Sequence, residues 1–138
     1  MEFIQLFNEL YNKFMEGYVS SESYKECFSN MSYKEVSYLS EIHIHKGISL
    51  VELSKKMGVT KSAVSQIVNK LCKKKYIEKK QSKYDKRESN LYLTEKIEKV
   101  YAKNDKSLNK IFDESLSSIS EEEKKIFCKL LIKINKKL

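Results

Sequence analysis

The absence of proline is the feature that most limits what this chain can fold into. Its 138 residues include no proline and only three glycines, whereas loop-rich sandwiches, barrels and collagen-like repeats depend on these residues. Apolar residues make up 41% of the chain and charged residues 33%. That balance suits one folded domain, or a small domain with an extension, better than a disordered chain. The composition therefore predicts a mostly helical, folded protein.

The sequence shows neither a membrane segment nor a disulfide framework. No apolar run approaches the roughly 18 residues of a membrane-spanning helix, and no basic segment followed by an apolar one opens the chain. We therefore expect a cytoplasmic protein with no membrane partner. The cysteines at 27, 72 and 128 are far apart and odd in number, which predicts unpaired thiols rather than a zinc ribbon or a disulfide scaffold.

The net charge of +8 comes from one segment of the chain. Between residues 55 and 87, twelve basic residues are opposed only by Glu78 and Asp85, a net charge of +10, while the rest of the chain sums to −2. A polyanion is the natural partner of such a segment, and nucleic acid is the commonest one. The alternative is a lysine-rich solvated surface, which the overall lysine content alone would also explain.

Both ends of the chain carry apolar side chains at helical spacing. Residues 3–18 form one broad stripe, residues 97–116 a second and residues 126–134 a third. Stripes this broad usually pack against more than one neighbour. We therefore expect the two ends to pack together and against a second copy of the chain. Residues 19–31 predict a connection or a short helical turn.

Serines followed three positions later by glutamate mark the expected starts of three helices. These capping boxes open at Ser32, Ser49 and Ser120, where the hydroxyl accepts an amide of the first turn and the glutamate reaches back. Gly47 and Gly58 can adopt the left-handed conformation that ends a helix. We expect them to stop the helices that begin at Ser32 and Ser49.

Residues 50–70 have the internal pattern of a helix-turn-helix. Ser54 is small where the two helices must approach, Gly58 lies in the turn, and Thr60 caps a second helix that runs to about residue 74. The apolar contacts between the helices are expected from Leu53, Met57, Val59, Val64, Ile67 and Leu71.

The exposed side of the second helix carries hydroxyls, amides and lysines, which suit hydrogen bonding to base edges in a major groove. Gln66 and Asn69 could each bind adenine bidentately. An ordinary amphipathic helix with a polar exterior would look similar and is the alternative. The candidate DNA-binding residues of this segment are Thr60, Lys61, Ser62, Ser65, Gln66, Asn69, Lys70 and Lys73.

Residues 76–80 and 90–94 predict two strands of a hairpin with a long basic tip. Arg87 is the single arginine among 27 basic residues, and a planar guanidinium fits a narrow minor groove in a way that lysine does not. Asp85, two residues away, is the candidate for orienting it. The tip adds four candidate DNA-binding residues, namely Lys83, Asp85, Lys86 and Arg87.

These segments resemble the winged helix-turn-helix regulators of the MarR family. The resemblance rests on residues 58–65, on Asp85-Lys86-Arg87 and on the exit strand and helix start at residues 91–96. It implies a homodimer on a pseudo-palindromic operator in double-stranded DNA. Its recognition helices would lie in successive major grooves, and its wings, through Asp85 and Arg87, would reach the adjacent minor groove.

Two positions depart from the family pattern, in which glycine is usual. Lys75 lies at the end of the second helix, and Ile97 follows the wing. A lysine at 75 must either take a left-handed conformation, at a cost of about 1 kcal/mol, or let the helix end differently.

The resemblance also implies an effector site between the dimer helices and the winged domain, where aromatic or lipophilic anions are frequent. Helical aromatics are more often core residues than ligand contacts. Phe7 stands where peroxide-sensing members carry a cysteine, so that mechanism is not expected. The aromatics available for an effector are Tyr11, Phe14, Tyr18, Tyr38 and Tyr101.

No metal or cofactor is expected. His43 and His45 lie two positions apart on a predicted helix, so their side chains point in different directions and cannot share one metal ion. No nucleophile–base set, phosphate loop or paired carboxylate cluster is visible either. An enzyme is therefore not expected.

The sequence predicts a mostly α-helical fold with a small β-hairpin wing. A winged helix-turn-helix would span residues 32–94, and residues 1–31 with 95–138 would form a helical dimerisation region. The expected function is a homodimeric, sequence-specific transcriptional regulator, a repressor released by a small lipophilic or aromatic effector. The alternatives are a non-specific architectural DNA binder and a winged-helix protein-interaction module.

Overall fold

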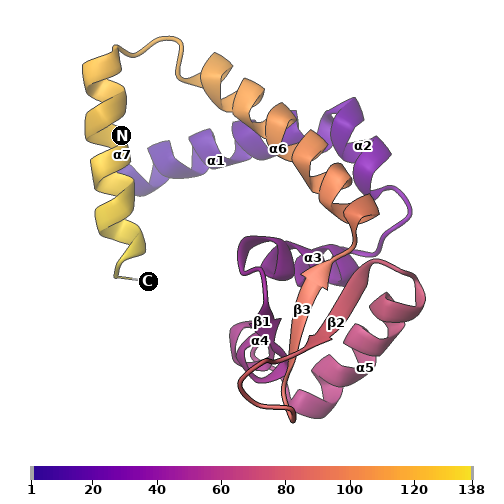
Figure 1. The fold of residues 1–138 in the computed structure, drawn as a ribbon. Helices are drawn as coiled ribbons and strands as arrows, with labels where there is room; N and C mark the ends of the chain where they lie inside the picture. Colours follow the sequence, from indigo (N-terminus) through magenta and orange to yellow (C-terminus); the bar gives the residue numbers. More distant parts are fainter. Residues whose placement is uncertain (1, 138) are drawn as a thin grey trace. The chain divides into compact units, whose positions relative to one another are not determined.

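The structure is a computed structural model that describes residues 2–137 (Figure 1). These residues form helices and one small antiparallel sheet, which confirms the predicted fold class. The helices are α1 (Phe3–Ser20), α2 (Glu22–Phe28), α3 (Tyr33–Ile44), α4 (Leu50–Met57), α5 (Lys61–Lys73), α6 (Glu95–Ser115) and α7 (Glu121–Asn135). The strands are β1 (Ile48–Ser49), β2 (Ile77–Gln81) and β3 (Ser89–Leu93).

The chain divides into two compact units. The first contains the described residues of Met1–Ser20 and Asp105–Leu138, and the second contains Ser21–Asn104. The second unit is larger than the winged helix-turn-helix expected over residues 32–94. Its core also includes Phe28 of α2 and Ile97 and Tyr101 of α6. Helix α6 thus contributes to both units.

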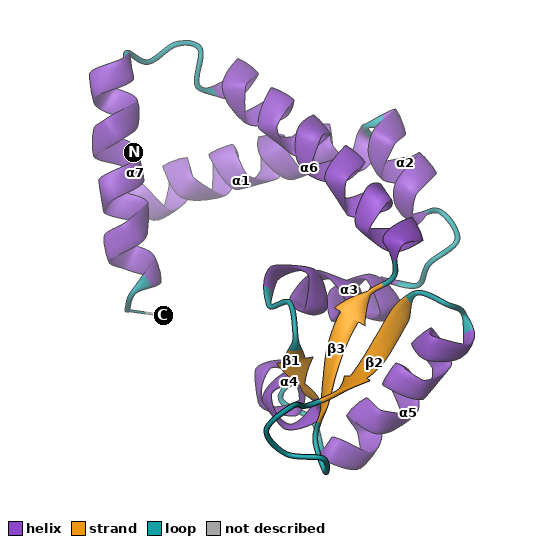
Figure 2. Cartoon of the chain, viewed as in Figure 1, coloured by secondary structure: helices purple, strands orange, loops and turns teal. Residues whose placement is uncertain are grey.

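The core of the second unit lies between the sheet and helices α3, α4 and α5 (Figure 2). The strand order is β1-β3-β2, with Ile48 opposite Leu91 and Ile77 opposite Leu93. The side chains that are wholly inaccessible to solvent are Leu39, Ile42, Leu53, Val64, Val68, Leu71 and Leu91.

The predicted contacts between α4 and α5 are present, with one exception. Leu53, Val64 and Leu71 are fully buried, and Met57 and Ile67 pack against them. Val59 is 40% exposed, because it follows the turn residue Gly58 and its side chain does not reach the core. Ser54 is buried where the helices approach, as expected.

The predicted helix starts are all confirmed. In each of the three capping boxes, at Ser32, Ser49 and Ser120, both reciprocal hydrogen bonds are formed. Thr60 accepts the backbone N–H of Ala63 at 3.2 Å and so caps α5. Each of these signals lies within four residues, so the local sequence specifies it.

The two glycines have different roles. Gly58, at φ 65°, ends α4 as predicted. Gly47 does not stop α3, which ends at Ile44 with His45 as its cap. Gly47 has φ 82° and donates its N–H to the Leu91 carbonyl at 3.0 Å. A Cβ there would lie 2.9 Å from the Tyr92 hydroxyl, so this glycine serves the approach to the sheet.

One element was not expected from the sequence, and another is longer than expected. Strand β1 has only two residues and exists because it pairs with β3. Residues 22–28, where the sequence predicts a connection or a short helical turn, form helix α2, which Ser21 caps by accepting the Tyr24 N–H at 3.1 Å. Phe28 at its end is buried in the core.

Helix α5 ends in a left-handed lysine. Lys75 has φ 59° and is the non-glycine residue with positive φ among residues 2–137. The N–H groups of Lys75 and Tyr76 donate to the carbonyls of Cys72 and Leu71, each at 3.0 Å. This is the Schellman pattern, which normally places glycine at the left-handed position.

Replacing Lys75 by glycine is expected to raise the free energy of unfolding by about 1 kcal/mol, because glycine adopts this conformation without a Cβ clash. Urea denaturation followed by circular dichroism measures the change. Lys75→Gln removes the same charge but keeps the strain, so it is the matched control and should give no such gain. Equal stabilisation by both variants would assign the effect to charge.

The first unit leaves large apolar surfaces uncovered. Neither α1 nor α7 has a buried residue, although both carry the apolar stripes that the sequence predicts. The rings of Phe14 and Phe112 are in contact, with centroids 4.3 Å apart and planes tilted by 36°. The apolar residues of α1 and α7 that are at least 42% exposed include Phe3, Ile4, Leu6, Phe7, Leu10, Tyr11, Ile126, Leu130, Leu131, Ile132 and Ile134.

None of the helices within residues 2–137 is both long enough and apolar enough to cross a membrane.

Candidate nucleic-acid interface

Helix α5 has the two faces that the sequence predicts. Val64, Val68 and Leu71 are buried in the core of the second unit. The eight candidate residues from Thr60 to Lys73 lie on the other side, where seven are exposed and Ser65 is half-buried. A row of hydroxyl, amide and ammonium groups is therefore available on one helix surface. DNA binding by this surface stays a prediction.

The two amides of this surface have different surroundings. Gln66 is exposed. The side-chain oxygen of Asn69 accepts a hydrogen bond from Lys79 Nζ of β2 at 2.6 Å. Since Lys79 occupies one acceptor site of that oxygen, the Asn69 NH₂ group is the part left fully available to a base. The sequence did not indicate Lys79, because the contact joins a helix to a strand ten residues away.

The C-terminal end of α5 is tied to the start of α3 by a buried carboxylate. Glu35 Oε2 accepts the Ser32 N–H at 3.0 Å, and Glu35 Oε1 accepts a hydrogen bond from Lys74 Nζ at 2.5 Å. Lys70 Nζ lies 3.9 Å from the same oxygen. The Lys74 hydrogen bond is the main cause that holds the pKa of Glu35 below its ordinary range, against the opposing effect of burial.

Glu35→Gln is expected to lower the free energy of unfolding by about 2 kcal/mol at pH 7, because a charge-assisted buried hydrogen bond is lost. The pKa of Glu35 is depressed in the folded state. Its stabilisation is therefore complete above the pKa of the unfolded chain and disappears as the pH falls through the folded-state value. Urea denaturation from pH 7 to well below pH 4 should show a constant difference between the two proteins down to about pH 5 and a shrinking difference in stronger acid.

Glu95→Gln is the matched control, since Glu95 forms an exposed i, i+4 pair with Lys99 at 3.1 Å and such pairs stabilise little. A constant difference between wild type and Glu35→Gln at every pH would contradict the role of the carboxylate charge.

The wing loop, residues 82–88 between β2 and β3, is ordered by internal hydrogen bonds. The Ser82 N–H donates to the Glu88 carbonyl at 2.9 Å, and the Gln81 side-chain amide donates to the Lys86 carbonyl at 2.8 Å. Asp85 Oδ1 accepts the backbone N–H of Arg87 at 2.9 Å. Among residues 2–137, the Asp85 carboxylate thus contacts the backbone of Arg87 and not the Arg87 guanidinium. Asp85 shapes the loop, which corrects the expected role as orienter of the side chain.

Most of the candidate cations have no acidic partner within the protein. All twelve basic residues between positions 55 and 87 are exposed. Some are engaged internally, since Lys79 bonds Asn69 and Lys80 lies 4.9 Å from the centre of the Tyr92 ring. Among residues 2–137, the candidate cations that form no ion pair are Lys61, Lys73, Lys83, Lys86 and Arg87. A polyanion could therefore bind them without breaking internal pairs.

The first turn of α5 and the wing share one hollow. Lys61, Asp85 and Arg87 line a depression of about 220 Å³ that also includes Ser49 and Val51 at the start of α4. The structure thus brings together predicted residues that are more than twenty positions apart. The remaining candidates extend from this hollow along α5 and along the wing loop.

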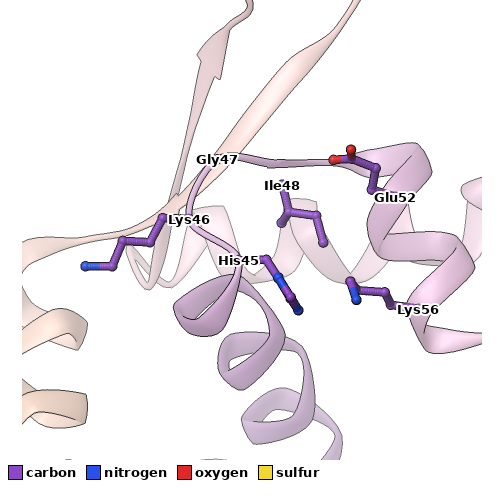
Figure 3. Close-up of a pocket in the computed structure, with 6 residues that line it drawn as sticks. All are labelled: His45, Lys46, Gly47, Ile48, Glu52 and Lys56. Atoms are coloured by element: carbon purple, nitrogen blue, oxygen red, sulfur yellow. The ribbon is translucent and has the colours of Figure 1, made fainter. Parts of the chain in front are cut away.

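A second hollow of about 400 Å³ lies on another part of the same unit (Figure 3). His45 and Lys56 point into a common space there, while Lys46 points away from them. Lys46 Nζ is 3.5 Å from a Glu98 oxygen, and Glu52 caps α4. Lys46 and Glu52 therefore make separate contacts, with Glu98 and with the Ser49 backbone. Within residues 2–137, no group of three His, Cys, Asp or Glu residues could hold a metal ion.

The five aromatics considered for an effector fall in different surroundings. Tyr11 and Phe14 line an all-apolar hollow of about 200 Å³ in the first unit, together with Phe7, Phe112 and Phe127. Tyr18 lies one turn further along α1 and stacks on Phe14 at 6.5 Å.

Tyr38 and Tyr101 belong to the core of the second unit and do not line that hollow. The Tyr101 hydroxyl is hydrogen-bonded to Ser40 Oγ at 3.0 Å and donates to the Val36 carbonyl at 3.3 Å. Tyr38 and Tyr101 therefore both contribute to the packing of this core.

The geometry agrees with comparisons to known proteins. A family model described as the MarR family matches residues 29–88. A MarR protein from Peptoclostridium difficile is 30% identical with a TM-score of 0.65, and the alignment covers 99% of this chain and 88% of that one. No curated protein matches the chain.

Two further solved structures share the fold at lower identity. A mutant of MepR from a multidrug-resistant S. aureus clinical isolate is 19% identical with a TM-score of 0.76, over 99% of this chain and 97% of that one. FabT of Streptococcus pneumoniae, solved in complex with DNA, is 24% identical with a TM-score of 0.67, over 96% and 91% of the two chains.

Proposed function

Because this chain belongs to the MarR family of transcriptional regulators, we propose that it acts as a homodimeric repressor that recognises a pseudo-palindromic operator. The observation that carries the proposal is the exposed polar face of α5, which lies beside wing cations that have no acidic partner in the described chain. The similar FabT structure is a DNA complex, which supports a DNA partner for this chain too.

In this proposal α5 enters the major groove. Its N-terminal cap and first two turns, with Thr60, Lys61, Ser62, Ser65 and Gln66, face the base edges, because the N-terminal residues of a recognition helix reach furthest into the groove. Asn69, Lys70 and Lys73 follow on the same face. The wing residues Lys83, Asp85, Lys86 and Arg87 approach the neighbouring minor groove.

Two copies are needed because one recognition helix reads only a half-site. The uncovered apolar faces of α1 and α7 support dimerisation, since large exposed apolar patches commonly mark interfaces. The predicted regions 1–31 and 95–138 supply these faces. The proposed repressor would act in the cytoplasm, and a small lipophilic or aromatic effector would release it from DNA. The apolar hollow at Tyr11 and Phe14 supports such a ligand.

The test is a salt series of fluorescence-anisotropy titrations with two duplexes. One is taken from the DNA upstream of the protein's own gene (the upstream duplex), and the other is the same sequence scrambled. We expect the upstream duplex to bind at least ~10³-fold more tightly, with a steep dependence on salt. Equal, salt-sensitive binding to both would indicate an architectural DNA binder. Binding to neither at low salt would indicate a protein-interaction module.

A further inference from the structure

The wing tip carries an aromatic side chain with no contact in the protein. Tyr84 is 100% exposed, more than any other large hydrophobic residue of the described chain. The proposed interface above includes only the charged residues of this loop. Covering this ring with a partner would remove a large apolar surface from water.

Hydrogen bonds shape the backbone of the loop that carries this ring. The Tyr84 N–H donates to Ser82 Oγ at 3.2 Å, and the Ser82 N–H donates to the Glu88 carbonyl at 2.9 Å. The Glu88 N–H donates to the Asp85 carbonyl at 3.0 Å. The loop backbone is therefore ordered before a partner binds, so that covering the ring costs the freedom of its side chain but little further ordering of the backbone.

The neighbours of Tyr84 define the chemistry of what covers it. Lys83, Lys86 and Arg87 are exposed on the same loop and form no ion pair within residues 2–137. Asp85 and Glu88 on the same loop leave it a net charge of +1, three cations minus two carboxylates. An anionic partner that also offers apolar surface therefore fits the loop best. The minor groove of DNA provides both, since phosphates line its edges and the C–H groups of deoxyribose form its walls.

We propose that Tyr84 is a DNA-contacting residue whose ring packs against a deoxyribose wall of the minor groove next to Arg87. The contact reads the width of the groove rather than the identity of a base, because sugars carry no sequence information. This inference rests on the proposed DNA-binding function and adds an uncharged contact to it.

An uncharged contact has a distinctive salt signature. Tyr84→Ala should weaken binding to the upstream duplex by about tenfold at every salt concentration, because apolar surface buried by the ring is lost. The slope of log K against log salt should not change, because no counterion is released. Lys83→Ala, on the same loop, should lower that slope by about 0.9. Anisotropy titrations of both variants from low to moderate salt separate the two effects.

The absence of tryptophan from the chain allows a direct probe of the ring. Tyr84→Trp places one indole at the wing tip. Tyr33→Trp is the matched control, because Tyr33 is 87% exposed and lies at the start of α3. At low salt the upstream duplex should shift the emission of the indole at position 84 to shorter wavelength and reduce its quenching by acrylamide severalfold. The indole at position 33 should change little.

The outcomes separate this inference from the proposed function. Full binding by anisotropy, with unchanged emission and quenching at position 84, would overturn the role of Tyr84 and leave DNA binding intact. Wild-type affinity of Tyr84→Ala would do the same. If neither the upstream nor the scrambled duplex binds wild-type protein at low salt, DNA binding itself is refuted and the role of Tyr84 with it.

Discussion

Replacing Ile126 and Leu130 together by glutamine is expected to convert the proposed dimer into a monomer and to weaken binding to the upstream duplex by roughly 100-fold or more. Both side chains lie one helical turn apart on α7 and are more than half exposed. Their burial in a second copy would supply part of the apolar core of an interface. Once the copies separate, the second half-site no longer binds at a high effective concentration.

Glutamine is chosen because it changes no charge, so any loss of DNA affinity cannot arise from electrostatics. Sedimentation equilibrium gives the oligomeric state, and anisotropy gives the affinity. Ile44→Gln is the matched control, since Ile44 is 67% exposed and lies at the end of α3 in the other unit. A wild-type protein that sediments as a monomer, or a monomeric variant with unchanged affinity, would contradict the proposed dimer.

Arg87→Lys is expected to weaken specific binding by about tenfold or more while leaving binding to the scrambled duplex nearly unchanged. The substitution keeps the charge, and the charge supplies non-specific affinity. It removes the planar, weakly hydrated guanidinium that suits a narrow minor groove. The ratio of the affinities for the two duplexes is therefore the quantity to measure.

Lys83→Ala is the comparison, because it removes one charge from the same loop without touching the guanidinium. It should reduce affinity for both duplexes alike and by less than Arg87→Lys reduces specific binding. Similar losses of specificity in the two variants would mean that Arg87 acts only as a positive charge.

Short-range signals made the starts of several helices predictable. Each capping box joins residues three positions apart, so Ser32, Ser49 and Ser120 contain the full information about where their helices begin. The left-handed turn at Gly58 is also local. The helical spacing of the apolar residues along α5 then determines which side of the helix enters the core.

Contacts between distant segments could not be predicted in this way. The sequence identifies Glu35 as a capping residue, but its second oxygen meets Lys74, which is 39 positions away. The Lys79–Asn69 hydrogen bond is of the same kind. Strand β1 is too short to have a pattern of its own, and only its pairing with β3 defines it.

Asp85 shows that a motif can be present while the contact predicted from it is not the one that forms. The Asp-x-Arg spacing suggests an ion pair, but an aspartate side chain also reaches the backbone N–H two residues later. The structure adopts the backbone contact. The spacing of two residues permits both, and sequence alone does not choose between them.

Arg87 is a single site at which the protein can be modified or cleaved selectively. It is the single arginine of the chain and is exposed on the wing. A guanidinium-selective reagent, or a protease that cleaves only after arginine, therefore attacks this protein at one position. A cut there falls between β2 and β3, whose pairing involves residues on both sides of it. The rate of that reaction depends on the accessibility of the wing loop alone. It can therefore be used to measure whether a partner covers this loop.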